Sequence, residues 1–274
     1  MNRCNRTLIA ACFAAVGLAQ TPALADQLSD IKARGTLICG VLPAVQPFGF
    51  QDPQTREIVG YDVDFCKAIA KNLGVKPELK ITSSESRMPE LMQGRVDLLV
   101  AALSYSKPRA EQIDFSDSYY VGQVKLFVRQ DRGYKTRDDL VGKRIAMTKG
   151  SSFAPVLTNL MPTSPQLAFE AVPIAVLAVV QGKADAYVGG ESTLMGFKDK
   201  MEAETPMMVL GPAVMLDAWG MGVQKGEPAL LKAVNDALTA MEKSGEAQKI
   251  FDHWLGSGSS YKMTREFKIE PIKR

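Results

Sequence analysis

Histidine and cysteine, the residues that most often bind zinc or support nucleophilic catalysis, are scarce in this sequence of 274 residues. It has one histidine, His253, and four cysteines, of which Cys4 and Cys12 fall within the first 25 residues. CxxC pairs, GxGxxG loops and GxxxxGK[ST] loops are missing. The sequence therefore predicts no metal site, no cofactor and no catalytic residue. His253 stands beside Trp254 in a predicted helix, where it is expected to be packed rather than reactive.

Apolar runs long enough to cross a bilayer, which takes roughly 20 residues, are also missing. An N-terminal run, Leu8–Ala19, follows two arginines and precedes the small residues of Ala23-Leu24-Ala25. This pattern predicts a cleaved signal peptide over residues 1–25 and a periplasmic mature protein. Two alternatives stay open, namely a membrane-anchoring helix and lipidation at Cys12.

Neither sign of charge is in clear excess. The chain has 33 basic and 30 acidic residues, and loss of Arg3 and Arg6 with the signal leaves 31 against 30, a net charge of +1. Such a balance gives no electrostatic reason to expect nucleic acid or an anionic membrane as a partner. The mature 249 residues (274 minus 25) suffice for one large or two small domains.

Strand-like and helix-like segments alternate along the mature chain. Strands are expected over 37–41, 78–81 and 96–101, with helices over 62–73 and 87–93 between them. A second set has strands over 143–147, 166–170 and 186–188 and helices over 153–160 and 174–181; two further helices, 229–243 and 246–255, close the chain. This order predicts an α/β fold in which mostly parallel sheets are flanked by helices.

Two such sets of about 90–100 residues predict two lobes. A short strand at 221–223 is too isolated to stand alone and is placed in the first sheet, so the chain must cross between the lobes twice, near 119–126 and 211–217. We expect a first lobe of residues 26–122 and 214–274 and a second lobe of residues 123–213. A cleft between lobes joined by a double hinge can enclose a solute from both sides.

Only Cys39 and Cys66 remain after removal of the signal. One lies in a predicted strand and the other in the helix that follows it, and consecutive elements of an α/β unit usually pack together. An oxidising compartment favours a disulfide between them, and two buried free thiols are the alternative.

Three loops follow predicted strands, at the edge where open α/β sheets bind ligands. The first contains Ser104 and Arg109, and a guanidinium can grip a carboxylate with two parallel hydrogen bonds. The second, Gly150-Ser151-Ser152, precedes a helix and offers free N–H groups and hydroxyls to an anion. The third carries Glu191, a candidate acceptor for an ammonium group. The respective alternatives are a surface arginine, a simple helix cap and a solvated acid.

Two other residues are candidates for the same cleft. Arg87 follows the second predicted strand, so its side chain is placed near the same mouth. Phe48, in Gln46-Pro47-Phe48-Gly49-Phe50, is a candidate apolar wall, although a single aromatic residue is more often part of a core.

Five stretches of the mature chain resemble the family-3 extracellular solute-binding proteins, which capture polar amino acids for ABC importers. They are GYDVDFCKAIA, SRMPELMQGRVDLLVAALSYSKPRAEQIDFSDSYY, GKRIAMTKGSS, GKADAYVGG and SGEAQKIFDHWL. The segments SSESRMPEL and YKMTREFKIEPI are most similar to the glutamate/aspartate branch. The resemblance implies a type II periplasmic-binding-protein fold, delivery of a free L-amino acid to inner-membrane permease subunits, and a monomer.

Carried over to this sequence, the resemblance implies that Arg109 holds the ligand's α-carboxylate with help from Ser104 and the Ser151-Ser152 turn. Arg87 would face a side-chain carboxylate, and Phe48 would line the side-chain pocket. Two positions depart from the family pattern. Gly190 replaces the usual aspartate that receives the α-ammonium, which leaves Glu191 as the substitute, and Ala102 replaces a frequent hydroxyl residue.

The expected ligand is thus an acidic or neutral L-amino acid, glutamate or aspartate above all. A different class of function remains possible, because the fold also resembles that of periplasmic cyclohexadienyl dehydratases, in which Glu191 would be the candidate general acid. A sensory role, in which the loaded protein docks on a chemoreceptor or a sensor kinase, is the other alternative.

Overall fold

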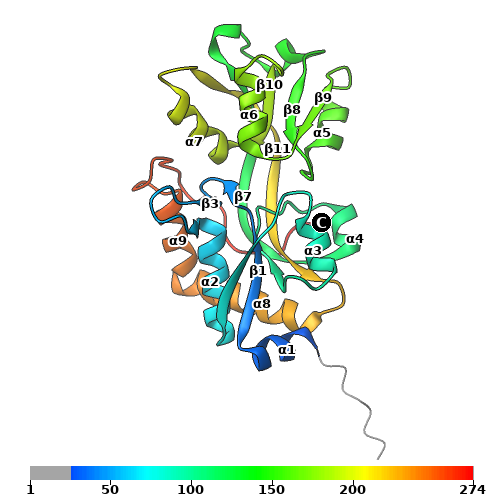
Figure 1. Cartoon of the computed structure of the whole chain (residues 1–274), viewed down its shortest axis with the longest axis vertical. Coiled ribbons are helices and arrows are strands. Elements are labelled where there is room, and N and C mark those ends of the chain that lie inside the picture. The colour runs from blue at the N-terminus through cyan, green and yellow to red at the C-terminus, as the bar shows by residue number, and fades with distance from the viewer. Residues whose placement is uncertain (1–25, 274) are drawn as a thin grey trace, which may run out of the picture.

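The computed structural model describes residues 26–273, so the predicted signal peptide lies outside the described residues. Figure 1 shows two α/β lobes, one above the other, joined by two long strands that run side by side between them. No helix within residues 26–273 is long and apolar enough to cross a membrane.

The first lobe, at the bottom of Figure 1, is built from both ends of the described chain. Its elements are α1 (Gln27–Arg34), β1 (Thr36–Val41), β2 (Ala44–Val45), β3 (Gly49–Gln51), β4 (Ile58–Val59), α2 (Tyr61–Leu73), β5 (Lys76–Ile81), α3 (Arg87–Met92), β6 (Leu98–Leu99), α4 (Lys107–Gln112), α8 (Pro228–Ser244) and α9 (Glu246–Trp254). Strands β2, β3 and β4 form a small separate antiparallel sheet.

The second lobe follows the first crossing of the chain. Its elements are the 3-10 turns Gln130–Arg132 and Arg137–Leu140, then β8 (Ile145–Thr148), α5 (Phe153–Leu160), β9 (Gln166–Phe169), α6 (Val172–Val180), β10 (Ala186–Gly190) and α7 (Glu191–Met201). Strand β8 pairs in parallel with both β9 and β10, as expected for strands linked by helices.

Two strands connect the lobes, β7 (Ile113–Arg129) and β11 (Met207–Gln224). They pair antiparallel along most of their length and lie in the middle of the strand order β5-β1-β6-β11-β7-β10-β8-β9. Their pairing shifts register between Leu210 and Met215 and again near Gly220. The predicted crossings are thus parts of two continuous strands, and the predicted short strand at 221–223 is the end of β11.

Each lobe has apolar residues on both faces of its sheet. In the first lobe, α2, α8 and α9 cover one face through residues such as Phe65, Leu238 and Phe251, and Leu91 of α3 packs on the other. In the second lobe, α5 covers one face and α6 and α7 the other. These helices are stabilised mainly by burying their apolar faces against the sheet, because short helices are only marginally stable in isolation.

Most predicted elements are confirmed within two or three residues, and α5 has the predicted bounds. The clearest difference is β6, which has two residues where six were expected. Residues Leu98 and Leu99 pair with β1, but Ala102 has a φ of +47°, which turns the backbone out of the sheet just beyond. This turn places the backbone carbonyls of Ala101 and Ala102 within hydrogen-bonding reach of the Arg87 side chain.

The predicted disulfide is confirmed. Cys39 of β1 and Cys66 of α2 are bonded, with their Cα atoms 6.3 Å apart, and both are fully buried. The bond ties the first helix of the central α/β unit to its sheet.

Candidate functional site

A cavity of about 60 Å³ lies between the lobes, beside the strands that connect them. Both lobes contribute to its wall. Its lining residues are Leu42, Val45, Ser84, Arg87, Ala102, Ser104, Thr148, Ser151, Phe153, Val172, Tyr187, Gly190, Thr193, Asp217 and Trp219. The set combines an apolar surface with a few charged and hydroxyl groups, which is typical of a small-molecule site.

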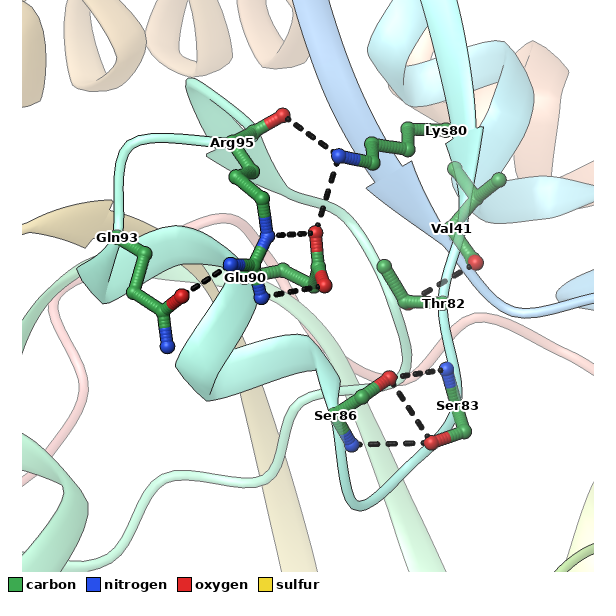
Figure 2. Close-up of polar contacts among 8 residues, drawn as sticks. All are labelled: Val41, Lys80, Thr82, Ser83, Ser86, Glu90, Gln93 and Arg95. Carbon is green, nitrogen blue, oxygen red and sulfur yellow. Dashed lines mark hydrogen bonds and ion pairs between the residues drawn. The ribbon is translucent and has the colours of Figure 1, made fainter.

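Polar contacts hold the turn before α3 and so fix the position of Arg87, the first residue of that helix (Figure 2). Ser83 and Ser86 each donate their backbone N–H to the other's hydroxyl oxygen, both at 3.0 Å. Farther along the helix, Glu90 accepts hydrogen bonds from Arg95 and forms an ion pair with Lys80. These bonds lower the pKa of Glu90 to about 2. Arg87 thus stands at the first turn of a helix that is fixed at both ends.

Arg87 points from this helix into the cleft and is 3% exposed. Its guanidinium donates to the carbonyls of Ala101 and Ala102 in its own lobe and, at 3.4 Å, to the carbonyl of Gly150 in the second lobe. Burial, and the charge of nearby Arg109, lower the pKa of Arg87 to about 9. Because its Nε has no partner within residues 26–273, the guanidinium has donor capacity left within the cleft.

Arg109 of α4 does not line the cavity itself, but it lines a neighbouring hollow that shares Ser84 and Ser151 with it. Its guanidinium donates to the same Gly150 carbonyl as that of Arg87. Its Nη1 donates to the carbonyl of Ser104 at 2.7 Å, and its Nη2 donates to the carbonyl of Gly150 at 2.6 Å. Burial lowers its pKa, and the carboxylate of Asp217 opposes that shift. Two guanidinium groups therefore meet at one carbonyl oxygen. Like charges held this close in a poorly solvated place favour an anion.

The Gly150-Ser151-Ser152 turn faces the two arginines from the second lobe. It leads directly into α5, whose first N–H groups have no intrahelical acceptor. The hydroxyl oxygens of Ser151 and Ser152 are buried and make no hydrogen bond to a described residue. Gly150 has a φ of +70°, and a Cβ there would lie 2.4 Å from the carbonyl oxygen of Ser84, so only glycine allows the lobes this close approach.

Asp217 of β11 contributes a carboxylate to the cavity wall and is 4% exposed. Its Oδ2 accepts hydrogen bonds from the Ser104 hydroxyl at 2.8 Å and from the Trp219 indole at 2.7 Å. Its Oδ1 is buried and has no hydrogen-bond partner among the described residues. Burial raises the pKa of Asp217, and the two hydrogen bonds and the arginines oppose that shift.

Buried side-chain polar atoms without a partner are concentrated at this place. Six are found in residues 26–273, and four of them belong to Arg87, Ser151, Ser152 and Asp217. Buried polar atoms are normally hydrogen-bonded, because leaving one unpaired costs roughly 1–3 kcal/mol. Their concentration in one cleft indicates a polar ligand site.

Ala102 lines the cavity, and its backbone N–H donates to the buried carboxylate of Asp62 at 2.8 Å. Phe48 does not line the cavity. It is fully buried one layer behind the wall, where its ring packs edge-on against Trp219, with centroids 4.5 Å apart, and against Tyr120. The aromatic surface that faces the cavity at this place is Trp219.

The structure also places Glu191 outside the cavity. Its carboxylate pairs with Lys125 at 2.6 Å and lines a separate hollow of about 440 Å³ together with Tyr120 and Tyr261. Gly190, its neighbour, does line the cavity. The peptide geometry at the start of α7 therefore directs residues 190 and 191 to different spaces.

Sequence reasoning missed several lining residues, among them Thr148, Thr193, Trp219 and Asp217. A signal for Asp217 was present, because it is a single charged residue within the apolar stretch Val214–Val223. Such a buried acid on a central strand needs a partner. No group of three or more metal-ligating residues occurs in the described part of the chain.

Several known proteins that this chain resembles are amino-acid-binding proteins. The chain is 29% identical over 254 residues to the ABC transporter glutamine-binding protein of Bacillus subtilis, with 90% of this chain and 92% of the relative covered. It is 26% identical over 275 residues to the L-glutamate/L-aspartate-binding protein of Pseudomonas aeruginosa, with 92% and 90% covered.

A solved structure shows the same architecture. The ancestral amino acid-binding protein AncCDT-1, a precursor of cyclohexadienyl dehydratase, superposes with a TM-score of 0.76 at 29% identity, over 84% of this chain and 99% of the other. The model of the bacterial extracellular solute-binding proteins, family 3, matches residues 37–257, and this chain belongs to that family.

Proposed function

We propose that this protein is the substrate-binding component of an amino-acid ABC importer, that it is exported to the periplasm as a monomer, and that it encloses an L-amino acid between its lobes. The observation that carries the proposal is the meeting of Arg87, Arg109 and the Gly150-Ser152 turn at a cleft where four buried polar atoms have no partner in the described part of the chain. The named relatives, which bind glutamine and glutamate or aspartate, support it.

The α-carboxylate of the ligand is assigned to Arg109, with Ser151 and Ser152 as further donors. Arg109 is held by the Ser104 carbonyl on its own lobe, so its fork stays oriented toward the second lobe. The hydroxyls and the N-terminus of α5 face it from across the cleft. A carboxylate placed there would bind both lobes at once and so favour the closed form.

An acidic amino acid fits best because the cleft presents a second guanidinium. Arg87 is more deeply buried than Arg109 and shares the Gly150 carbonyl with it, so their repulsion is relieved most fully by two carboxylates. A neutral amino acid would leave one buried positive charge without a counter-charge, which is costly in a desolvated site.

The lobe boundaries belong to the same proposal. Residues 26–122 with 214–274, and residues 123–213, would move as two bodies about the middle of β7 and β11. The register shift between Leu210 and Met215 lies at one boundary and supplies a natural point of bending.

A melting-temperature screen of residues 26–274 against the twenty L-amino acids and simple dicarboxylates tests this function. A ligand that binds only the folded chain raises its stability by about 2.7 kcal/mol at one hundred times its dissociation constant. We expect L-glutamate or L-aspartate to give the largest rise. If none of the amino acids raises the melting temperature, the proposed function is wrong.

A dehydratase activity is the second candidate, favoured by the similarity to AncCDT-1. It would need a general acid in the cleft. Glu191 lies outside the cavity, and Asp217 is the acidic side chain among the described lining residues. Turnover of prephenate by the purified chain would establish this activity, and its absence would leave binding alone.

A further inference from the structure

A buried carboxylate with one occupied and one free oxygen is present on β11. The Oδ2 atom of Asp217 is fixed by Ser104 and Trp219, so the side chain cannot rotate without losing both hydrogen bonds. The Oδ1 atom is then held in place beside the cavity with no donor from the described residues. Such an arrangement is a preorganised acceptor.

The protein's own cations do not neutralise Asp217. Arg87 and Arg109 are close enough to influence its titration, but neither forms an ion pair with it among the described contacts. Both guanidinium groups are directed to backbone carbonyls instead. A buried carboxylate without a close counter-charge is costly, and a cationic donor from a ligand would remove that cost.

The other acid near this end of the site is already paired. Glu191 forms its ion pair with Lys125 and opens on a different hollow. Gly190, which does line the cavity, has no atom within 4 Å of the position its Cβ would occupy. The second lobe therefore offers space but no charge where an ammonium group could bind.

We propose that Asp217, on the connecting strand β11, receives the ammonium group of the bound amino acid and so selects for ligands that carry one. The inference rests on the proposed function, since it assigns one end of the same ligand. Under this assignment the arginines bind the carboxylates of the ligand, and Asp217 distinguishes an amino acid from a dicarboxylate that has no ammonium group.

Calorimetric titration of the Asp217→Asn variant with L-glutamate and with glutarate tests this assignment. Glutarate has both carboxylates of glutamate and no ammonium group. Asparagine keeps an oxygen for the Ser104 and Trp219 hydrogen bonds but loses the charge, so the fold is expected to survive, which melting without ligand will verify. We expect L-glutamate to bind about 100-fold more weakly and glutarate to change much less.

Two further variants sharpen the result. Glu191→Gln is the matched control, and it should leave glutamate affinity within about threefold of the wild type, because its carboxylate faces another space. Gly190→Asp added to Asp217→Asn should recover part of the lost affinity for glutamate but not for glutarate, since the open space at position 190 allows an acid from the second lobe.

The outcomes separate the two claims. Wild-type protein that binds no amino acid defeats the proposed function, and the assignment of Asp217 falls with it. Wild-type protein that binds glutamate keeps the function intact. In that case near-wild-type binding by Asp217→Asn, an unchanged preference for glutamate over glutarate, or loss of binding in Glu191→Gln would each overturn the role of Asp217.

Discussion

The two lobes supply the cleft with different kinds of groups. The first lobe and the strand joined to it contribute charged side chains, Arg87, Arg109 and Asp217, each held by hydrogen bonds to its own neighbourhood. The second lobe contributes a glycine turn and the hydroxyls of Ser151 and Ser152, which are buried and bind no other described residue. The charged side chains of the first lobe are thus held in position by their hydrogen bonds, whereas the groups of the second lobe are free to bind a ligand.

This difference suggests an order of events. A ligand that meets the open protein can pair with the fixed charges of the first lobe before the second lobe contributes anything. We expect closure then to bring the Gly150 turn against Ser84, as in the described structure, and to add hydrogen bonds of smaller individual strength. Charged contacts should therefore dominate affinity, and the second lobe should govern closure.

The largest effect is expected for Arg109→Ala. Removing one partner of a buried charge pair usually costs about 3–5 kcal/mol, so amino-acid binding should weaken beyond about 100-fold in calorimetry. Arg109→Lys keeps the charge but loses the planar guanidinium, so its affinity should lie between those of the wild type and the alanine variant. Unchanged affinity in the alanine variant would remove Arg109 from the site.

The disulfide provides a test that affects only the first lobe. Replacing Cys39 and Cys66 together by alanine opens a loop with a sequence separation of 27 and should lower the free energy of unfolding by about 3.5 kcal/mol. Hydrogen exchange should show faster opening of β1 and α2 than of β8 and α5. Equal loss of protection in both lobes would mean that they do not behave as separate bodies.

The pH dependence of stability tests the buried carboxylate of Asp62, which accepts a hydrogen bond from Ala102 in the cavity wall. Burial raises the pKa of Asp62 in the folded state from 3.8 to about 6, against hydrogen bonds from Tyr119 and Ala102. Between about pH 4 and pH 6 the unfolded chain releases this proton first, so the wild type should lose about 3 kcal/mol of stability relative to Asp62→Asn and then change no further. If the free energies of unfolding of the wild type and of Asp62→Asn, measured by denaturation, change in parallel with pH across this range, the pKa of Asp62 is not raised.

The smallest effects are expected from the second lobe. Ser151→Ala and Ser152→Ala each remove one hydroxyl, worth about 1 kcal/mol, and should weaken binding about fivefold. Without ligand, their stability should not fall, because neither hydroxyl forms a hydrogen bond within the described structure. Ser164→Ala is the matched control in the same lobe. Its hydroxyl bonds Gly142 and Leu140, so its loss should lower stability and spare affinity. A serine variant as weak as Arg109→Ala would contradict the division between the lobes.

Much of the fold could be predicted because the apolar periodicity is strong. The bounds of α2 and α5 and the alternation of strands and helices follow from local pattern and from stop signals such as Gly74, which adopts a φ of +74°. The length of β7 and β11 could not be predicted, because each strand leaves one lobe and enters the other, and its burial pattern changes on the way.

The site was predictable where a residue follows a strand end and less so elsewhere. Arg87, Ser104 and Ser151 line the cavity, as strand order and family resemblance predicted. Arg109 lines a neighbouring hollow that shares Ser84 and Ser151 with the cavity. Phe48 does not line the cavity because its ring is buried in the core, against Trp219. Glu191 does not line it because, at the start of α7, residue 190 faces the cavity and residue 191 faces another hollow. Asp217 lies on a connecting strand far along the chain, and only the tertiary structure brings it to Ser104.

Closure around a ligand is tested most directly by small-angle X-ray scattering with and without L-glutamate, in the wild type and in Gly150→Ala. A Cβ at position 150 would collide with the backbone of Ser84, so the variant should be unable to close fully. We expect glutamate to reduce the radius of gyration of the wild type and to leave that of the variant nearly unchanged. Tight binding of glutamate by the wild type with no compaction, or equal compaction of both proteins, would contradict it.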